Sequence, residues 1–322
     1  MDIYSLAPEE LASSCGLSPR FRGTQLFRGI QKELASSYDQ ITTLPLALRT
    51  RLSAEHPLDT YSVERELSDP DGTRKLLIRF PDGLGVESVL LKDEHGRATG
   101  CISTQVGCAM GCRFCKTARM GLKRNLTAGE IVLQALALSR MYGALDNIVF
   151  MGMGEPLANF EAFSRAVAIL SHPEGLGLGH RRMTVSTAGV VPGILRLAEE
   201  GPPVRLAVSL TAADDEKRKS LMPVDVSYPL PRLREALLCY QKRARKRITL
   251  EWVLLGGINS GDEDAKGLIG FVRGLSAVVN VIPWNKVPEI PFEEPAREET
   301  ERFVSLLEGA GIAVTRRYRR GK

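Results

Sequence analysis

The clearest chemical signal in the sequence is a short loop that carries three cysteines. Cys108, Cys112 and Cys115 follow the spacing C-x3-C-x2-C within GCAMGCRFCKTARMG, where several glycines allow tight turns. Three thiolates on so short a loop can each bind one iron of a 4Fe-4S cluster and leave the fourth iron without a protein ligand. A structural zinc site prefers four protein ligands, and no fourth cysteine or well-spaced histidine follows. The loop therefore predicts an open iron–sulfur cluster.

An open iron in turn predicts the second cofactor. The amino and carboxylate groups of S-adenosylmethionine (SAM) can chelate such an iron and bring the sulfonium close to the cluster. One electron then cleaves the bond between sulfur and C5′ and leaves a 5′-deoxyadenosyl radical. Phe114, between the second and third cysteines, would help to keep the cluster dry. We therefore expect a radical SAM enzyme, supplied with electrons by a donor such as flavodoxin or ferredoxin.

The segments that must position this loop alternate between apolar runs and longer amphipathic stretches. Alternation of this kind indicates parallel βα units and an α/β fold. The expected strands are NIVFMG (147–152), RMTVSTAG (182–189), VRLAVSLTA (204–212), RITLEWVLL (247–255), VVNVIPWN (278–285) and IAVTRRY (312–318).

Polar residues stand directly after these strands, where ligands gather in parallel sheets. Gly154 and Glu155 follow the first strand, and the Glu155 carboxylate could accept from the amino group of methionine. Ser186, Ser209 and Asn285 occupy the same place on later strands and could bond the ribose hydroxyls and the carboxylate of SAM. Each of these residues, taken alone, is also common as a cap at the end of a strand.

The part of the chain before Cys101 has a different pattern. Residues 18–56 predict two or three short amphipathic helices, with Leu26, Phe27 and Ile30 at helical spacing. Alternating apolar and polar residues then surround DPDG, PDG and EHG turns, which indicates strands joined as hairpins. The predicted domains are an N-terminal helical domain (1–58), a β-hairpin extension (59–100) and a catalytic domain (101–322).

Charge and cysteine content indicate partners and compartment. The net charge is +5, and basic residues gather at 242–247 (KRARKR), at 316–322 (RRYRRGK) and at Arg20, Arg22, Arg28 and Lys32. Such clusters suit a polyanion such as RNA, although each could equally be a solvated helix face or tail. Six cysteines, four of them between 101 and 115, suggest metal or redox chemistry rather than a disulfide scaffold. With no apolar run of membrane-spanning length and a polar, acidic N-terminus, we expect a cytoplasmic protein with no membrane partner.

Over nearly its whole length the sequence resembles the RlmN/Cfr family of radical SAM RNA methyltransferases. The resemblance lies in FRGTQLFRGIQK, TTLPLALRTRL, VESVLL, CISTQVGCAMGCRFCKTARMGLKRNLTAGEIV, FMGMGEPL, VSTAGVVPGI and PWN. It implies a partial (β/α)6 radical SAM barrel, a small N-terminal RNA-binding domain, and methylation of carbon 2 of adenine in large-subunit (23S) ribosomal RNA and some transfer RNAs. Carbon 2 lies between two ring nitrogens and is too electron-poor to attack the methyl group of SAM as a nucleophile.

The resemblance also implies roles for individual residues. Cys101 matches the cysteine that takes the proton from carbon 2 and closes a disulfide to release the product, and Glu87 matches an acidic proton acceptor. In isolation, Cys101 would be a buried strand cysteine and Glu87 an ordinary exposed strand residue. The positions that match SAM-binding residues are Gly154, Glu155, Ser186, Ser209, Leu210, Thr211 and Asn285.

Two departures from the family pattern bear on the reaction. The family's Ser-Leu-His reads Ser209, Leu210, Thr211 here, and the ACGQL-like segment with a methyl-accepting cysteine is not found before Lys322. A truncated copy, a replacement cysteine such as Cys239, or a different radical reaction would each account for this. Two other functions therefore stay open: a radical SAM enzyme that abstracts hydrogen from another substrate without methylating RNA, and an RNA-binding protein whose cluster is only structural.

Overall fold

The computed structural model describes residues 2–316, so the basic residues after Arg316 lie outside the described part of the chain. The described residues form two compact units. Unit 1 holds residues 2–106, 124–153 and 159–183, and unit 2 holds residues 107–123, 154–158 and 184–316. The domain boundaries predicted at residues 58 and 100 stay predictions.

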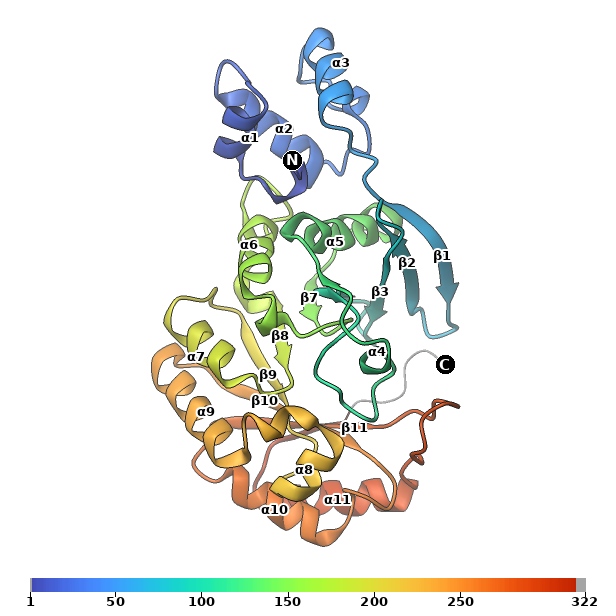
Figure 1. The fold of residues 1–322 in the computed structure, drawn as a ribbon, viewed down its shortest axis with the longest axis vertical. Helices are drawn as coiled ribbons and strands as arrows, with labels where there is room; N and C mark the ends of the chain where they lie inside the picture. Colours follow the sequence, from blue (N-terminus) through green and yellow to red (C-terminus); the bar gives the residue numbers. More distant parts are fainter. Residues whose placement is uncertain (1, 317–322) are drawn as a thin grey trace. The chain divides into compact units, whose positions relative to one another are not determined.

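Unit 1 begins with closely packed helices, shown in blue in Figure 1. A Cβ on Gly23 would lie 2.1 Å from the carbonyl oxygen of Pro8, and one on Gly29 would lie 2.7 Å from the Ile41 side chain. Glycine at these two places lets α2 touch its neighbours at backbone distance. The predicted short amphipathic helices are confirmed. The elements are η1 (Ile3–Ser5), α1 (Pro8–Ser14), α2 (Phe21–Gln31), η2 (Tyr38–Gln40) and α3 (Leu46–Glu55).

The predicted hairpins are also confirmed in unit 1. Its main strands lie in the order β1-β2-β3-β4-β7, and the first four pair antiparallel. β4 in addition pairs parallel with β7, with Gly100 opposite Ile148. The strands are β1 (Ser62–Ser68), β2 (Arg74–Arg79), β3 (Gly85–Lys92), β4 (Ala98–Cys101), β7 (Asn147–Phe150) and the short antiparallel pair β5 (Gln105–Val106) and β6 (Arg124–Asn125).

A long buried helix, α5 (Ala128–Tyr142), packs against α6 (Phe160–Ser171) in the same unit. A capping box starts α5, because Thr127 Oγ1 accepts from Glu130 N at 3.1 Å and Glu130 Oε2 accepts from Thr127 N at 2.8 Å. The helix ends at Gly143, whose φ of +92° suits glycine. The remaining element of unit 1 is η4 (His180–Arg182).

Gln134 of α5 joins this helix to two strand segments through a fully buried polar cluster. Its Oε1 accepts from Ser88 Oγ at 2.8 Å and from Ser103 N at 2.7 Å. Its Nε2 donates to Ser103 O at 2.9 Å and to Glu130 O at 3.1 Å. Since Gln134, Ser88 and Ser103 are all fully buried, these bonds fix the backbone at Ser103, two residues after Cys101, and link it to β3.

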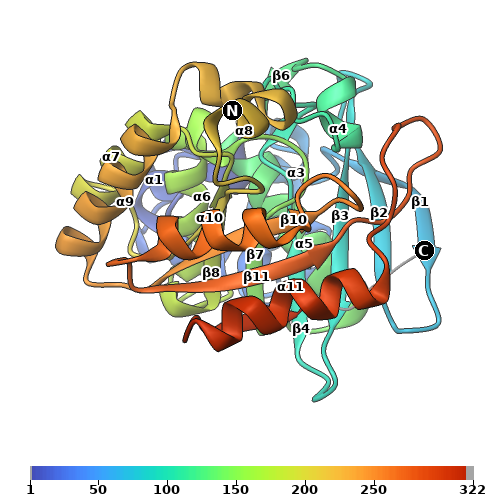
Figure 2. The same ribbon diagram turned by 90° about the horizontal axis from the view of Figure 1, so that it is seen from below.

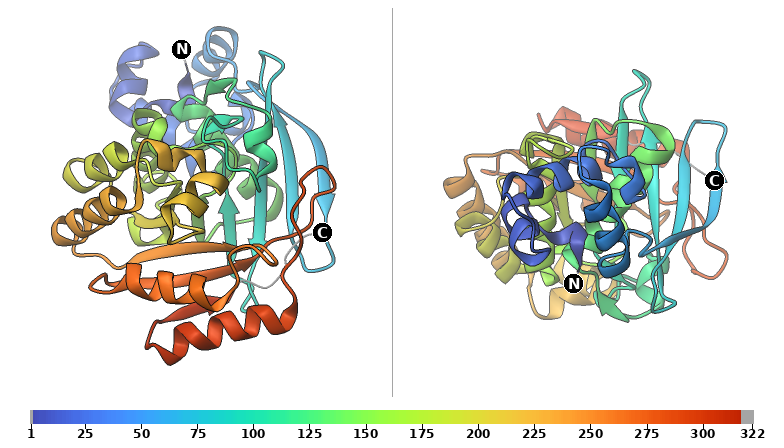
Figure 3. Two further views of the ribbon diagram at one scale, coloured as in Figure 1. Left: turned by 60° about the horizontal axis from the view of Figure 1, so that its bottom comes forward. Right: turned by 90° about the horizontal axis from the view of Figure 1, so that it is seen from above.

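Unit 2 is built from parallel strands in the order β8-β9-β10-β11-β12. Helices α7 and α9 pack together, and α10 packs against α11. Figure 2 and the left view of Figure 3 show α10 and α11 beside β11. The strands are β8 (Met183–Thr187), β9 (Arg205–Ser209), β10 (Ile248–Leu254), β11 (Ala277–Pro283) and β12 (Val314–Arg316). The helices are α4 (Lys116–Arg119), η3 (Pro156–Ala158), α7 (Val191–Glu199), α8 (Asp215–Leu221), η5 (Pro223–Val226), α9 (Leu230–Ala244), α10 (Asp262–Val272) and α11 (Arg297–Gly309).

All six apolar runs that the sequence predicts as strands form strands, namely β7 to β12. All six are short and most are rich in β-branched residues, and buried side chains of β7 to β11 contribute to the core of their units. Trp252 of β10 is fully buried and donates from Nε1 to Asn259 O at 3.1 Å. Among residues 2–316, no helix is both long and apolar enough to cross a membrane.

We expect Gln134→Leu to lower the free energy of unfolding by about 3 kcal/mol, because buried donors and acceptors on Ser88 and Ser103 would lose their partners. Urea unfolding followed by circular dichroism measures this change. Ser88→Ala removes only one of the four bonds and should cost about 1 kcal/mol. Equal losses of unfolding free energy in the two variants would contradict a stabilising role for the other three hydrogen bonds of Gln134.

Candidate active site

The three loop cysteines belong to unit 2, and backbone contacts close their loop at its base. Cys108 N donates to Gly121 O at 3.2 Å, and Cys115 N donates to Cys112 O at 3.1 Å. Gly107 has a φ of +77°, and a Cβ there would lie only 1.8 Å from Gly121 O. The loop can therefore close in this form only when residue 107 is glycine.

The chemistry of these side chains fits a cluster. All three cysteines are free and half-buried. Burial raises the pKa of Cys108 to about 11 and that of Cys112 to about 12, so in the bare chain both are neutral thiols that a metal cation would deprotonate. Among the described residues, no three His, Cys, Asp or Glu side chains converge on a point that would hold a single metal ion. A 4Fe-4S cluster binds each thiolate at a separate iron and does not require such convergence.

An apolar cluster supports the loop from one side. Trp284 Nε1 donates to Phe114 O at 3.0 Å, and Arg113 N donates to Leu221 O at 2.9 Å. Met110, Cys112 and Phe114 pack against this cluster, which excludes water from that side of the loop. Its buried members are Ala188, Leu221, Met222, Val224, Leu255, Trp284 and Ile290.

Gly154 and Glu155 form the next part of the site, in the same unit. Gly154 has a φ of +102°, and the Glu155 side chain turns inward and is 2% exposed. Its Oε2 accepts from Ala188 N at 2.7 Å, and its Oε1 accepts from Leu157 N at 3.1 Å. Burial raises the pKa of Glu155 to about 7, despite the backbone hydrogen bonds that lower it. A cationic ammonium group would offset the cost of ionising this carboxyl.

The ends of β8, β9 and β10 bring further predicted residues together. Ser186 Oγ donates to Glu251 Oε2 at 2.9 Å, and Ser209 lies opposite Glu251 in the strand register. Leu210 N and Thr211 N both donate to Glu251 O, at 2.9 and 3.3 Å. Leu210 is fully buried, and its amide is held by the carbonyl of Glu251.

Thr211 is the most strained residue of this group. It has a φ of +59°, which is costly for a β-branched side chain, and it is fully buried. Asn259 fixes this conformation, because its Nδ2 donates to Thr211 O at 2.7 Å. The Thr211 hydroxyl is buried without a hydrogen-bond partner, as expected of a group that awaits a polar ligand. Asn285, by contrast, follows β11 as an exposed residue.

Cys101 and Glu87 lie on adjacent strands of unit 1. Cys101 ends β4 and stands opposite Val89 of β3. Glu87 is exposed and forms an ion pair with Lys75, with 3.3 Å between Nζ and Oε2. Ser103 Oγ donates to Glu87 O at 2.7 Å, which ties the two strands together near Cys101. Cys15 is buried in unit 1, and Cys239 is half-buried on α9 of unit 2.

Sequence reasoning missed two charged residues of the site, Glu251 and Arg218. Glu251 is a single acid within the apolar run ITLEWVLL, and its 7% exposure shows that the charge is turned inward. That isolated acid was a usable signal. Arg218 lies in the charged stretch DDEKRKS and gives no such signal, yet its side chain is fully buried.

Comparison with known proteins identifies what this chain is similar to. A family model described as the Radical SAM superfamily matches residues 102–269. A protein of Treponema pallidum (strain Nichols) named "Probable dual-specificity RNA methyltransferase RlmN" is 45% identical over 319 residues, 99% of this chain and 94% of that protein. A protein of the same name from Moorella thermoacetica is 45% identical over 334 residues, 100% of this chain and 94% of that protein.

Solved structures give the same result. The crystal structure of a radical SAM methyltransferase from Sphaerobacter thermophilus has a TM-score of 0.96 at 45% identity and covers 100% of this chain and 96% of that chain. HydG, a hydrogenase maturase, has a TM-score of 0.52 at 12% identity, covers 69% of this chain and 52% of that chain, and shares the fold alone. The predicted α/β radical SAM fold is confirmed.

We expect Gly107→Ala to prevent stable cluster uptake, because its Cβ would collide with Gly121 O. Iron and sulfide content after anaerobic reconstitution measures the effect. Gly121→Ala is the matched control: Gly121 also has a positive φ, of +64°, but a Cβ there meets open space. It should lose about 1 kcal/mol of stability and keep its iron. Equal iron content in both variants would contradict the steric argument.

The buried Glu155 carboxyl should make the stability of the cluster-free chain depend on pH. Its folded pKa of about 7 lies above the ordinary value of 4.5, so its contribution is full below pH 4.5 and is lost as pH rises through 7. The rise corresponds to roughly 3 kcal/mol at 1.36 kcal/mol per unit. Glu155→Gln should remove this loss, which urea unfolding at pH 5 and pH 8 would detect. Parallel pH profiles for the two proteins would contradict it.

Proposed function

The chain belongs to the radical SAM superfamily and, within it, to the RlmN family of RNA methyltransferases, and from this membership we propose that it methylates carbon 2 of adenine in RNA. The substrates we propose are 23S ribosomal RNA and transfer RNA. The observation that carries the proposal is end-to-end similarity. The RlmN-named relatives match both the N-terminal helices and the cysteine loop, whereas HydG covers only 69% of the chain.

The family uses a 4Fe-4S cluster and SAM, which together supply a 5′-deoxyadenosyl radical when bound. In this chain, we assign Cys108, Cys112 and Cys115 to bind iron. Their loop is closed at its base and packed against apolar side chains, which favours a dry environment for the cluster.

The residues we assign to SAM are those at the strand ends of unit 2. Glu155 would accept from the ammonium of the methionine moiety, because its carboxyl is buried, its pKa is raised to about 7, and a cation beside it would favour the ionised form. The unpartnered hydroxyl of Thr211 provides a polar group where the family has histidine. Ser186 and Ser209 lie beside Glu251 and are placed to orient ligand hydroxyls. The full proposed set is Gly154, Glu155, Ser186, Ser209, Leu210, Thr211 and Asn285.

Cys101 and Glu87 would act on the RNA substrate. We propose that the Cys101 thiolate takes the proton from carbon 2 of adenine, and that Glu87 serves as a proton acceptor. Cys101 is a half-buried cysteine at the end of β4, and Ser103, two residues further on, is held by Gln134. Glu87 is exposed and so remains in contact with solvent protons.

The RNA surface we propose is the N-terminal helical module. Arg20, Arg28 and Lys32 are exposed on and beside α2. The competing basic segment at 242–247 is largely engaged within the protein: Arg243 pairs with Glu199, Lys246 donates to Pro203 O, and Arg247 donates to Ala277 O. Arg28 itself pairs with Glu33 at 3.4 Å, but this contact is exposed and a phosphate could replace it, so we propose phosphate binding on α2 rather than on this segment.

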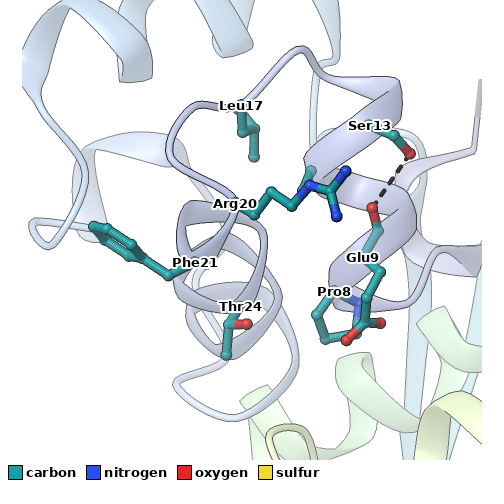
Figure 4. A pocket seen from close by; sticks show the side chains of 8 residues that line it. Pro8, Glu9, Ser13, Leu17, Arg20, Phe21 and Thr24 are labelled. Atoms are coloured by element: carbon teal, nitrogen blue, oxygen red, sulfur yellow. Dashed lines mark hydrogen bonds between the residues drawn. The ribbon is translucent and has the colours of Figure 1, made fainter.

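A cavity of about 540 Å³ lies between α1 and α2 in the same module. Figure 4 shows that the Arg20 side chain extends toward Ser13 and Glu9, while the Phe21 ring points away from them. Phe21 is 59% exposed. An exposed aromatic ring is a common platform for an unpaired base, which supports RNA as the partner.

The remaining partner and the compartment follow from the redox chemistry. We propose a one-electron donor such as flavodoxin or ferredoxin, because cleavage of SAM consumes one electron. We propose the cytoplasm as the compartment, since free cysteines and an iron–sulfur cluster persist where thiols stay reduced.

The test is anaerobic reconstitution with iron, sulfide, SAM and dithionite, followed by incubation with unmodified 23S ribosomal RNA or transfer RNA. Nucleoside mass spectrometry should find 2-methyladenosine together with 5′-deoxyadenosine. Cys115→Ala should abolish both products. Cys101→Ala should keep 5′-deoxyadenosine formation and lose methylation by about 100-fold or more.

A second arm uses the same chain extended by a C-terminal Ala-Cys-Gly-Gln-Leu segment, which supplies a methyl-accepting cysteine. Methylation in either arm supports the proposal. If both arms form 5′-deoxyadenosine but no methylated adenine, the enzyme acts on another substrate. If SAM leaves the EPR spectrum of the reduced cluster unchanged, the cluster is only structural.

A further inference from the structure

Arg218 is a charged side chain with no access to solvent. It lies on α8 of unit 2, is 0% exposed, and is second in size only to Trp252 among the largest fully buried side chains of the described residues. Burying a guanidinium is expensive unless its donors are paired. The position therefore needs an explanation beyond packing.

Three backbone carbonyls at the strand ends receive the donors of this side chain. Arg218 Nη2 donates to Ala188 O at 2.7 Å and to Ser209 O at 3.4 Å, and Nε donates to Leu210 O at 3.1 Å. Ala188 follows β8, Ser209 ends β9, and Leu210 comes directly after it. One planar guanidinium therefore holds the two segments that carry the proposed SAM residues.

The same contacts reach Glu155. Ala188 accepts from Arg218 at its carbonyl oxygen and donates to Glu155 Oε2 through its N–H. Gly189 leaves room for this arrangement, because a Cβ there would lie 3.0 Å from Arg218 Nη2. The position of the Glu155 carboxylate thus depends on a residue, Ala188, whose carbonyl Arg218 binds.

The cysteine loop is attached to the other end of the same element. Leu221, the last residue of α8, accepts from Arg113 N, and Pro223 lies 3.4 Å from where a Cβ of Gly111 would be. Arg218 Nη1 also donates to Asp225 Oδ1 of η5 at 2.6 Å. The α8–η5 segment therefore contacts both the cysteine loop and the strand ends.

We propose that Arg218 is a positioning residue that fixes the cysteine loop relative to the SAM-binding strand ends. In this proposal its fixed positive charge also favours the reduced state of the cluster. The inference rests on the proposed function, because it concerns how this chain holds the two cofactors. Three thiolates give the cluster site a net negative charge, and one further electron increases it. The buried guanidinium favours that state, and the Asp225 carboxylate, paired with it at 2.6 Å, opposes it.

The experiment compares variants of the reconstituted enzyme by two measurements that do not require RNA. The first is Kd for SAM, from the change in the EPR spectrum of the reduced cluster. The second is the midpoint potential of the cluster, from an EPR-monitored redox titration. Arg218→Gln should weaken SAM binding at least about tenfold and lower the potential.

Arg218→Lys separates the two roles. Lysine keeps the charge but lacks the planar fork of donors, so the potential should stay near that of the wild type while SAM binding remains weakened. Asp225→Asn keeps the three carbonyl bonds and removes a negative charge, so it should raise the potential with little change in Kd. It also keeps the proposal testable if Arg218→Gln does not fold.

Arg140→Gln is the matched control, because Arg140 of α5 donates to Leu34 O and Ala35 O at 3.0 and 2.7 Å in unit 1. It should lower thermal stability and leave Kd and potential unchanged. A wild-type Kd in Arg218→Gln, or potentials that move in the same direction in Arg218→Gln and Asp225→Asn, would overturn this inference alone. A wild-type chain that takes up neither cluster nor SAM would overturn the proposed function with it.

Discussion

A carboxyl group and a guanidinium are buried on either side of one residue of unit 2, Ala188, and the site depends on this arrangement. The carboxyl group of Glu155 accepts from Ala188 N, and the guanidinium of Arg218 donates to Ala188 O. Either charge left unpaired in the interior would cost several kcal/mol. Backbone groups at and just beyond the ends of β8 and β9 pair with these side chains. The proposed ligand-binding positions lie at the same strand ends.

Backbone conformation is the second requirement of the site. Gly107 closes the cysteine loop with a conformation and a close approach that no side chain permits. Thr211 adopts a left-handed conformation although it is β-branched, and Asn259 supplies the hydrogen bond that holds it. Strain of this kind persists only where the surrounding structure fixes it, and it often marks functional sites.

Much of the fold was predictable because its signals are local. The cysteine spacing, the turn residues of the hairpins and the short β-branched strands each depend on neighbours in the sequence, and the structure has them where they were expected. Arg218 was not predictable, since it lies between lysines on a helix that reads as solvated, and only tertiary contacts show that it turns inward. The sequence of the basic segment 242–247 suggests a solvent-exposed RNA-binding surface, but Lys246 and Arg247 donate to backbone carbonyls of the protein itself. Cys101 and Glu87 owe their assignment to family resemblance alone.

The glycine contacts of α2 affect how unit 1 can meet a nucleic acid. Gly23 brings α2 to backbone distance from Pro8, and Gly29 lets the Ile41 side chain lie directly against the backbone of the helix. A helix held this closely cannot slide or rotate without losing its packing. The cations on α2 then form a rigid template with fixed spacing rather than an adaptable arm. Such a template pays little ordering entropy on binding, and it selects RNA whose own backbone already has the complementary shape.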